Sequence, residues 1–227
     1  AALHALPQPA EPAPLLAPAD PLAALRDEVQ AQAAYLPEAR LEPAAERRIA
    51  AGLDALRALA AAPARPPRRL IAFDGHPGNY LVRDDGRAML VDLEKARYGP
   101  PPLDLAHATL YTSTTWDAAS HAVLELPDLV AFHRAWLAAQ PDAAAHAPWI
   151  VPLRHAMWLW SVTWCAKWRV LSERPVSTSS GGEDWSADLS DAALVRHVRE
   201  RVDHYLSTEI VERVWDEAEN LRASLQR

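Results

Sequence analysis

The sequence contains little cysteine, glycine or lysine, and the cysteine shortage by itself excludes whole classes of site. Its single cysteine, Cys165, cannot form an internal disulfide or a zinc site built from several thiols. Because tryptophans surround it in the sequence, we expect a buried, unreactive thiol rather than a nucleophile. One unpaired cysteine also suits a reducing compartment, so a cytoplasmic location is predicted.

Long apolar runs and an excess of positive charge are missing as well. No segment approaches the roughly 18 apolar residues of a membrane-spanning helix, and the N-terminus lacks the basic region of a signal peptide. The formal net charge is −7, which argues against nucleic acid or an anionic membrane as a partner, because both bind basic patches. The acidity is compatible with a cationic substrate, although an acidic surface that maintains solubility is the simpler explanation.

Helical patterns dominate what the sequence does contain. Half of the 227 residues are apolar, enough to bury a sizeable core. The prolines of residues 7–21 predict an extended connection, and the Ser/Gly-rich residues 177–182 predict a flexible break. Apolar residues recur at helical spacing in the segments 21–37, 43–62, 103–115, 127–139, 150–172, 190–206 and 207–225.

A short β-hairpin interrupts these helices. Residues 80–83 and 88–91 are strand-like, and the segment 84–87 between them contains the Asp-Gly pair typical of hairpin turns. Another short apolar run, residues 70–73, comes before the hairpin. The predicted fold class is therefore mainly α (α+β), a helical body with a small hairpin.

Polar side chains flank this hairpin. Asn79 comes directly before the first strand and Asp92 directly after the second, so antiparallel pairing should make them neighbours. Asp74 lies in the loop that leads to Asn79. Carboxylate and amide oxygens suit Mg²⁺, but Asp and Asn are also common turn formers. The pattern by itself leaves a metal site and a plain turn both open.

The order of these residues resembles that in the aminoglycoside phosphotransferase family, which includes choline kinase-like relatives. The family's catalytic loop reads His-Gly-Asp-x-His-Pro-Gly-Asn, and residues 74–79 read Asp-Gly-His-Pro-Gly-Asn. The family's later Asp-x-Glu and Asp-Leu-Ala segments match residues 92–94 and 104–106, so the close match covers residues 70–106. The resemblance implies the C-terminal lobe of a protein kinase-like fold. Such a protein transfers the γ-phosphoryl group of ATP or GTP to a hydroxyl of a small molecule.

Roles for the loop residues follow from this resemblance. Asp74 would orient the substrate hydroxyl and accept its proton. His76 would contact the phosphate. Asn79 and Asp92 would hold Mg²⁺ on the nucleotide phosphates. The resemblance does not name the acceptor molecule, because the family covers many acceptors.

Three other positions bear on the same loop. Glu94 would assist at a second metal position or at the substrate. Asp104 would brace the catalytic loop from below. Ala72 stands where the family has a histidine that supports the loop, so the rigidity of the loop, more than its chemistry, is expected to suffer.

The lobe that grips ATP in this family has no counterpart in the sequence. Its strand lysine is missing, since the two lysines, Lys95 and Lys167, both follow the loop, and no glycine precedes Gly52. We therefore expect residues 1–227 to be the C-terminal lobe alone, without the N-terminal lobe and with no assigned nucleotide-binding residues. Its expected parts are 1–69, 70–106 and 107–227. Such a chain by itself is expected to bind ATP poorly and to turn over negligibly.

The tryptophans predict mostly core packing. Trp160, Trp164 and Trp168 keep an i, i+4 spacing that is typical of a buried helix face. Trp158 points away from that stripe and is the candidate to line a substrate pocket, although core packing is favoured for it too. Weaker pocket candidates lie near predicted loops, at Trp116 and Trp185.

Alternatives to a phosphotransferase remain open at this point. One is a catalytically silent kinase-like binding or scaffold protein. Another is a metal-dependent hydrolase built on Asp74, His76 and Asp92, which would need further ligands. The late acidic residues are interpreted as a solvated helix face, a few of which could bind an amino-sugar substrate; these are Glu209, Glu212, Asp216, Glu217 and Glu219.

Overall fold

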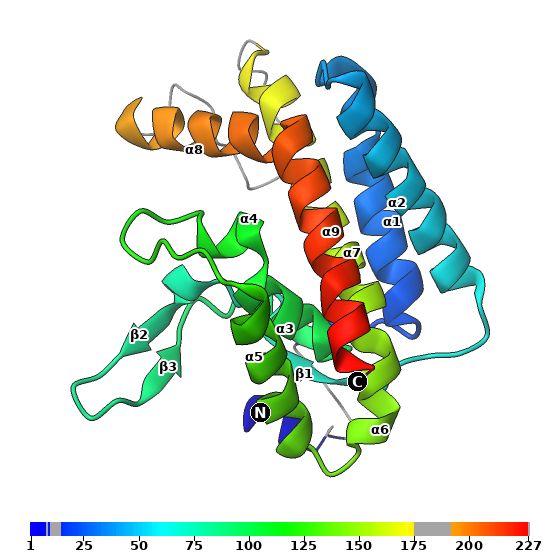
Figure 1. The fold of residues 1–227 in the computed structure, drawn as a ribbon, viewed down its shortest axis with the longest axis vertical. Helices are drawn as coiled ribbons and strands as arrows, with labels where there is room; N and C mark the ends of the chain where they lie inside the picture. Colours follow the sequence, from blue (N-terminus) through cyan, green and yellow to red (C-terminus); the bar gives the residue numbers. More distant parts are fainter. Residues whose placement is uncertain (8, 10–14, 175–191, 227) are drawn as a thin grey trace.

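The computed structural model describes residues 1–7, 9, 15–174 and 192–226. Within them the protein is mainly α, with two short pairs of antiparallel strands (Figure 1). The predicted fold class is therefore confirmed. The predicted flexible break at 177–182 and the pocket candidate Trp185 lie outside the described residues.

Helix α7 (Ile150–Ser172) forms the centre of the helical body. Its side chains Leu153, Met157 and Trp158 are almost completely buried. Five other helices pack against it: α1 (Pro21–Ala33), α2 (Pro43–Ala61), α3 (Pro102–Thr109), α8 (Ala192–Tyr205) and α9 (Thr208–Leu225). In Figure 1, α9 crosses in front of α7 while α1 and α2 lie beside it.

The ends of α1 illustrate how local sequence sets the helices. The Asp20 side chain accepts hydrogen bonds from the backbone nitrogens of Leu22 and Ala23, and Pro21 occupies the first helical position. The prediction carried this helix on to about residue 37. It ends at Ala33, because Pro37 has no N–H to donate to the Ala33 carbonyl.

The predicted helix over 103–115 is broken in two. Leu110 is extended (ψ 140°), so α3 ends at Thr109 and a separate short helix, α4, spans Tyr111–Thr114. The break has a tertiary cause: the buried Arg154 guanidinium donates to the Thr109 hydroxyl at 2.7 Å and to the Thr109 carbonyl at 3.1 Å. That carbonyl is therefore not available to continue the helix.

The hairpin forms where it was predicted, with β2 (Tyr80–Val82) and β3 (Ala88–Leu90) antiparallel and Tyr80 opposite Leu90. The turn uses Gly86 at φ 79°, a backbone conformation that favours glycine. The hairpin projects from the helical body (Figure 1).

A second strand pair was not predicted in full. β1 (Arg69–Ile71) pairs with β4 (Arg97–Gly99), so the ends of the segment that carries the loop and hairpin are brought together. No strand had been expected at 97–99, because its partner is distant in the sequence. The remaining elements are η1 (Leu3–Ala5), η2 (Leu36–Glu38), η3 (Pro77–Asn79), α5 (Leu126–Ala138), α6 (Ala143–His146) and η4 (Ala147–Trp149).

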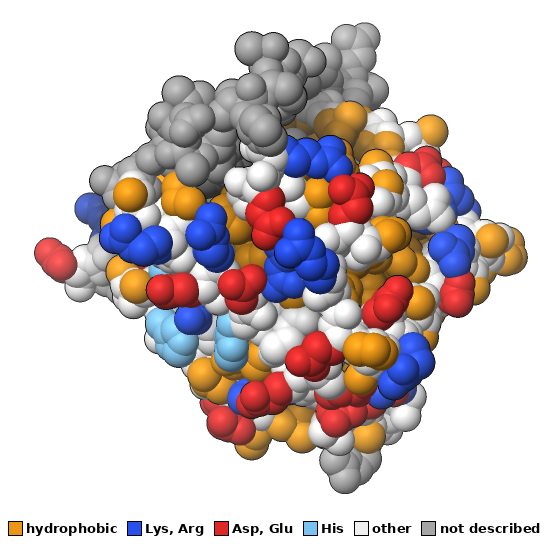
Figure 2. Space-filling view, turned by 90° about the horizontal axis from the view of Figure 1, so that it is seen from above, with side chains coloured by type: hydrophobic (Ala, Val, Ile, Leu, Met, Phe, Trp, Pro, Cys, Tyr) orange, Lys and Arg blue, Asp and Glu red, His pale blue; other side chains and the backbone are white. Residues whose placement is uncertain are grey.

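Two features of the surface bear on partners. None of the helices formed by the described residues combines the length and apolarity needed to cross a membrane. Over the described part of the face seen in Figure 2, acidic and basic side chains are intermingled rather than gathered by sign.

Candidate functional site

The loop between β1 and β2 is held from below by Asp104, in the first turn of α3. The Asp104 carboxylate accepts hydrogen bonds from the backbone nitrogens of Ala72 at 2.9 Å and Phe73 at 2.8 Å. It also accepts one from His4 Nε2 at 2.9 Å, and His4 in turn accepts from Trp136. The loop is thus supported through its main chain, so this support does not depend on the side chain at position 72.

Two residues of the site have a backbone conformation that non-glycine residues rarely adopt. Phe73 has φ 64° and Asp92 has φ 59°. A left-handed conformation costs such residues about 1–2 kcal/mol and tends to persist at functional sites, where the surroundings hold it in place. Phe73 is held by the Arg97 guanidinium, 3.7 Å from its ring centroid, and by an edge contact with Trp160.

Asp74 lies between two cationic or potentially cationic groups. Its Oδ2 is 3.0 Å from Lys95 Nζ and its Oδ1 is 3.6 Å from His107 Nδ1. Burial by itself raises the pKa of Asp74, but His107, Lys95 and the Lys95 hydrogen bond outweigh it, so the pKa lies below its ordinary value. Asp74 is therefore a carboxylate near neutral pH.

The two histidines beside Asp74 have assigned tautomers. His107 Nδ1 is 3.0 Å from the Phe73 carbonyl, which only accepts, so Nδ1 carries a proton. Burial lowers the pKa of His107, and the ring is neutral near pH 7. His76 Nδ1 accepts from the Gly78 nitrogen at 3.1 Å, so in a neutral ring its proton sits on Nε2.

Lys95 and His107 are the site residues that sequence reasoning missed. The sequence pattern marks Lys95 only as a lysine that follows the loop, and it assigns no role to His107. A signal was present for His107, since it lies three residues after Asp104 on one helix and so faces the same loop. For Lys95 no local pattern indicates that its side chain turns back to Asp74.

The predicted metal ligands lie at the base of the hairpin. The Asn79 carbonyl accepts a hydrogen bond from the nitrogen of Val91 at 2.9 Å. Asp92 is the next residue after Val91, so it follows directly after this backbone pairing. The Asn79 side chain donates to the Asp74 carbonyl at 2.8 Å. A hydrogen bond with Asp92 and the charge of Asp92 raise the pKa of Glu94, so these two carboxyl groups lie close together.

The oxygen donors at the base of the hairpin fit Mg²⁺ only if phosphate and water complete its coordination shell. No group of three or more His, Cys, Asp or Glu side chains arranged to hold a metal occurs among the described residues. Mg²⁺ usually takes only one or two protein carboxylates and completes its shell with phosphate and water. Asp92, Asn79 and the adjacent Glu94 match that pattern, and their role as ligands stays a prediction.

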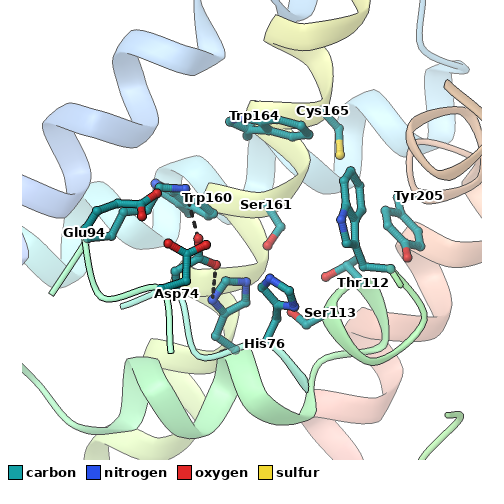
Figure 3. A pocket seen from close by; sticks show the side chains of 14 residues that line it. Asp74, His76, Glu94, Thr112, Ser113, Trp160, Ser161, Trp164, Cys165 and Tyr205 are labelled. Atoms are coloured by element: carbon teal, nitrogen blue, oxygen red, sulfur yellow. Dashed lines mark hydrogen bonds and ion pairs between the residues drawn. The ribbon is translucent and has the colours of Figure 1, made fainter. Parts of the chain in front are cut away.

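A cavity of about 330 Å³ runs from Asp74 along α7 (Figure 3). Its lining joins the residues of the loop and metal segment to α4, α7 and α8. It is lined by Asp74, His76, Asp92, Glu94, Lys95, His107, Thr112, Ser113, Trp116, Trp160, Ser161, Trp164, Cys165 and Tyr205.

Most of the tryptophans lie as predicted. Trp158, for which core packing was favoured over a pocket role, is only 1% exposed and does not line the cavity, because the central position of α7 buries that face. Trp160 and Trp168 are buried in the core as predicted, whereas Trp164 is half-buried against it. Trp160 and Trp164 also line the cavity, together with the weaker pocket candidate Trp116. Cys165 is buried as predicted, and burial raises its pKa to about 12.

The acidic residues of α9 do not reach this cavity. Glu217 pairs with the buried Arg154, and Glu212 pairs with Arg48. Glu219 pairs with Arg222 and His155. The prediction of a simple solvated face is therefore wrong for Glu217, whose partner on α7 is completely buried.

The match with known families agrees with the order of residues in the loop and hairpin. The model of the Phosphotransferase enzyme family (APH) matches residues 1–149. The chain belongs to this family. Comparisons with curated proteins and with solved structures gave no match. In this phosphotransferase family member, the matched part contains Asp74, the hairpin and Asp104 but ends before α7, so the Trp160 and Trp164 wall lies beyond it.

Proposed function

We propose that this protein transfers the γ-phosphoryl group of ATP or GTP to a hydroxyl of a small molecule. The observation that carries the proposal is the placing of Asp74. Its carboxylate faces a cavity of about 330 Å³ and lies beside Lys95. The oxygen donors Asn79 and Asp92 flank the hairpin that follows the same loop. A half-buried, ionised carboxylate that lines such a cavity is suited to orient a hydroxyl.

Asp74 would act on the acceptor hydroxyl. It would accept the hydroxyl proton as the acceptor oxygen bonds to the γ-phosphorus, while the bond from that phosphorus to the bridging oxygen breaks. The products are a phosphomonoester and a nucleoside diphosphate. Because phosphoryl transfer needs little covalent help, positioning by Asp74 would be the main contribution of this residue.

Lys95 would tune this reaction. It donates to Asp74 Oδ2, so it keeps the carboxylate ionised and in place. It lies 5.7 Å from the centroid of Trp160 and faces the same cavity. A cation in this position would also favour negative charge that develops next to Asp74 during transfer. His76 is proposed to contribute its Nε2–H to the same region.

Asp92 and Asn79 would hold Mg²⁺, with Glu94 beside them. When bound, Mg²⁺ neutralises charge on the phosphates and so eases transfer. The carboxyl groups of Asp92 and Glu94 lie close together, and a cation near them would relieve their repulsion.

The reducing environment implied by a single buried cysteine supports a cytoplasmic location.

The alternatives are less well supported. A catalytically silent protein would be favoured if Ala72 left the loop without support, but Asp104 supports the loop through the backbone of residues 72 and 73. A metal-dependent hydrolase needs further ligands, and the described residues contain no group of three metal-binding side chains.

Titration of Mg²⁺ and ATP or GTP into the full-length protein with a panel of small hydroxyl compounds tests the proposal. Asp74→Asn and Asp92→Asn should each lower phosphotransfer by about 10²–10⁴-fold, the range expected when a positioned acid–base group or a metal ligand is lost. Asp84→Asn, in the exposed turn of the same hairpin, is the matched control and should keep full activity. Normal activity in Asp74→Asn would refute the proposal, and nucleotide binding without any transfer would favour the silent protein.

A further inference from the structure

The cavity beside Asp74 has two chemically different ends. The ionisable groups Asp74, Asp92, Glu94 and Lys95 gather at one end with the two histidines. The other end is formed by aromatic rings and small neutral groups. Among the described lining residues, every carboxylate belongs to the first end.

The second end carries hydroxyl groups without partners. Thr112 is 5% exposed and Ser113 is 4% exposed, and neither hydroxyl has a hydrogen-bond partner among the described residues. A buried hydroxyl that makes no hydrogen bond costs free energy, so such groups normally meet a ligand or a water molecule. Figure 3 shows Thr112, Ser113 and Ser161 around the same space, between the tryptophans and His76.

The aromatic walls of this end are fixed. Trp116 packs edge-on against Trp164, with ring centroids 5.7 Å apart, and also contacts Tyr205. Trp160, whose ring lies beside Lys95 at the first end, donates from Nε1 to Glu28 at 2.6 Å. Flat, immobile rings present stacking surfaces to the apolar face of a sugar or cyclic polyol at little entropic cost.

Among the residues that the structure describes, the same end offers no counter-charge to an amine. A buried ammonium group without a partner is strongly disfavoured. The Tyr205 hydroxyl is bonded to Thr115 at 2.9 Å, and the α9 carboxylates are outside the cavity. Aromatic faces can attract a quaternary ammonium, but they leave the hydroxyls of Thr112 and Ser113 unsatisfied.

We propose that the acceptor is a small, neutral, polyhydroxylated ring compound that packs into the corner formed by Trp116 and Trp164, stacking on one of these two perpendicular rings, and hydrogen-bonds Thr112 and Ser113. This places one of its hydroxyls at Asp74. The inference rests on the proposed function for the transfer, whereas binding itself requires only the cavity. A volume of about 330 Å³ lies near the lower end of the usual range for ligand sites, about 300–1,000 Å³, which suits a ring of monosaccharide size.

Binding by the full-length protein can be measured by calorimetry. The probes are neutral monosaccharides and cyclitols, each paired with its amino-substituted counterpart, together with choline. We expect at least one neutral compound to bind about tenfold or more tightly than its amino counterpart. Thr112→Val and Ser113→Ala should each weaken that binding about fivefold to tenfold, the effect of one lost hydrogen bond.

Stability separates this role from a structural one. Because the two hydroxyls have no partner among the described residues, their removal should leave the thermal midpoint unchanged or raise it. Ser172→Ala is the matched control: its hydroxyl bonds the Arg169 carbonyl at the end of α7 and is not part of the cavity, so binding should not change. Loss of the fold in Thr112→Val would contradict a ligand-binding role for that hydroxyl.

The outcomes also distinguish this inference from the proposed function. Tighter binding of amino compounds or choline, or no binding of any neutral compound at millimolar concentration, would overturn the inference. Binding that Thr112→Val and Ser113→Ala leave unaltered would do the same. Neutral compounds that bind through both hydroxyls but are never phosphorylated would support the inference and refute the transfer reaction.

Discussion

The two ends of the cavity are built on opposite principles. At the Asp74 end, polar groups are tied to one another: Lys95 and His107 flank Asp74, and Asp104 holds the loop backbone beneath it. At the tryptophan end, Thr112 and Ser113 have no partners among the described residues. The first end is organised before any ligand arrives, whereas the second has hydrogen-bonding capacity to offer.

The difference indicates a division of labour. The pre-organised end lies inside the region shared with the phosphotransferase family, residues 1–149. At the other end Thr112, Ser113 and Trp116 also lie inside it, whereas Trp164 and Tyr205 come from α7 and α8, beyond that region. Chemistry common to a family needs fixed positions, while the choice of acceptor can vary with the helices that close the cavity.

The largest effect is expected where the loop is most tightly held. Asp104→Ala leaves two buried backbone N–H groups, those of Ala72 and Phe73, without an acceptor. We expect a loss of roughly 2–5 kcal/mol in the free energy of unfolding, because each unsatisfied group costs about 1–3 kcal/mol. Urea denaturation measures it, and activity should fall because the loop conformation is lost.

Asp54→Asn serves as the control for Asp104, since Asp54 is exposed on α2 and should change stability by less than about 0.5 kcal/mol. A loss of under about 1 kcal/mol in Asp104→Ala would mean that the Asp74 end is not the pre-organised region described above.

An intermediate effect is expected from Lys95. Lys95→Met should lower kcat roughly 10–100-fold, because it removes a cation 3.0 Å from Asp74. Lys95 lowers the pKa of Asp74, so its removal raises that pKa and moves the acid limb of the pH–rate profile to higher pH. Lys95→Arg should restore part of kcat and should return the acid limb part of the way toward its wild-type pH.

Lys167, the other lysine, provides the matched control on α7 outside the cavity. Lys167→Met should change neither kcat nor the position of the acid limb. If Lys95→Met lowers kcat without moving that limb, Lys95 does not act through the charge of Asp74.

The smallest effect is expected at the tryptophan end of the cavity, for the pH dependence of stability that Cys165 causes. Burial raises the pKa of Cys165 to about 12, from an ordinary value near 9. Between these values the unfolded chain loses the thiol proton while the folded chain keeps it, so stability falls as the pH rises above about 9. At pH 10.5 this group should cost roughly 2 kcal/mol relative to pH 8.

Cys165→Ala removes this contribution, so the difference in unfolding free energy between it and the wild type should change over that pH interval. Other titrating groups cancel in the comparison. A difference that stays constant from pH 8 to 10.5 would show that the folded protein does not hold the thiol neutral, and so that Cys165 is not buried at the tryptophan end.

Local features were predictable because they depend on neighbours in the chain. The cap at Asp20 and the hairpin turn at Gly86 follow from side chains within a few residues. The region around Asp74, Asn79 and Asp92 was predictable for the same reason, since one hairpin joins its parts.

Features that depend on distant partners were not predictable. The sequence pattern for 103–115 was continuous, yet the break at Leu110 depends on Arg154 from α7. Strand β4 forms because β1 lies beside it, and Trp158 is buried because α7 is enclosed by other helices.

The amino-acid sequence alone determined the family, the mainly helical fold and the candidate residues of the loop, because their order and spacing are written locally in the chain. Only the tertiary structure decided what surrounds Asp74 and what lines the cavity. Lys95 and His107 come to Asp74, and Thr112 and Ser113 come to Trp164, through the packing of separate elements. Such packing depends on the shape and burial of whole surfaces, which no short pattern encodes.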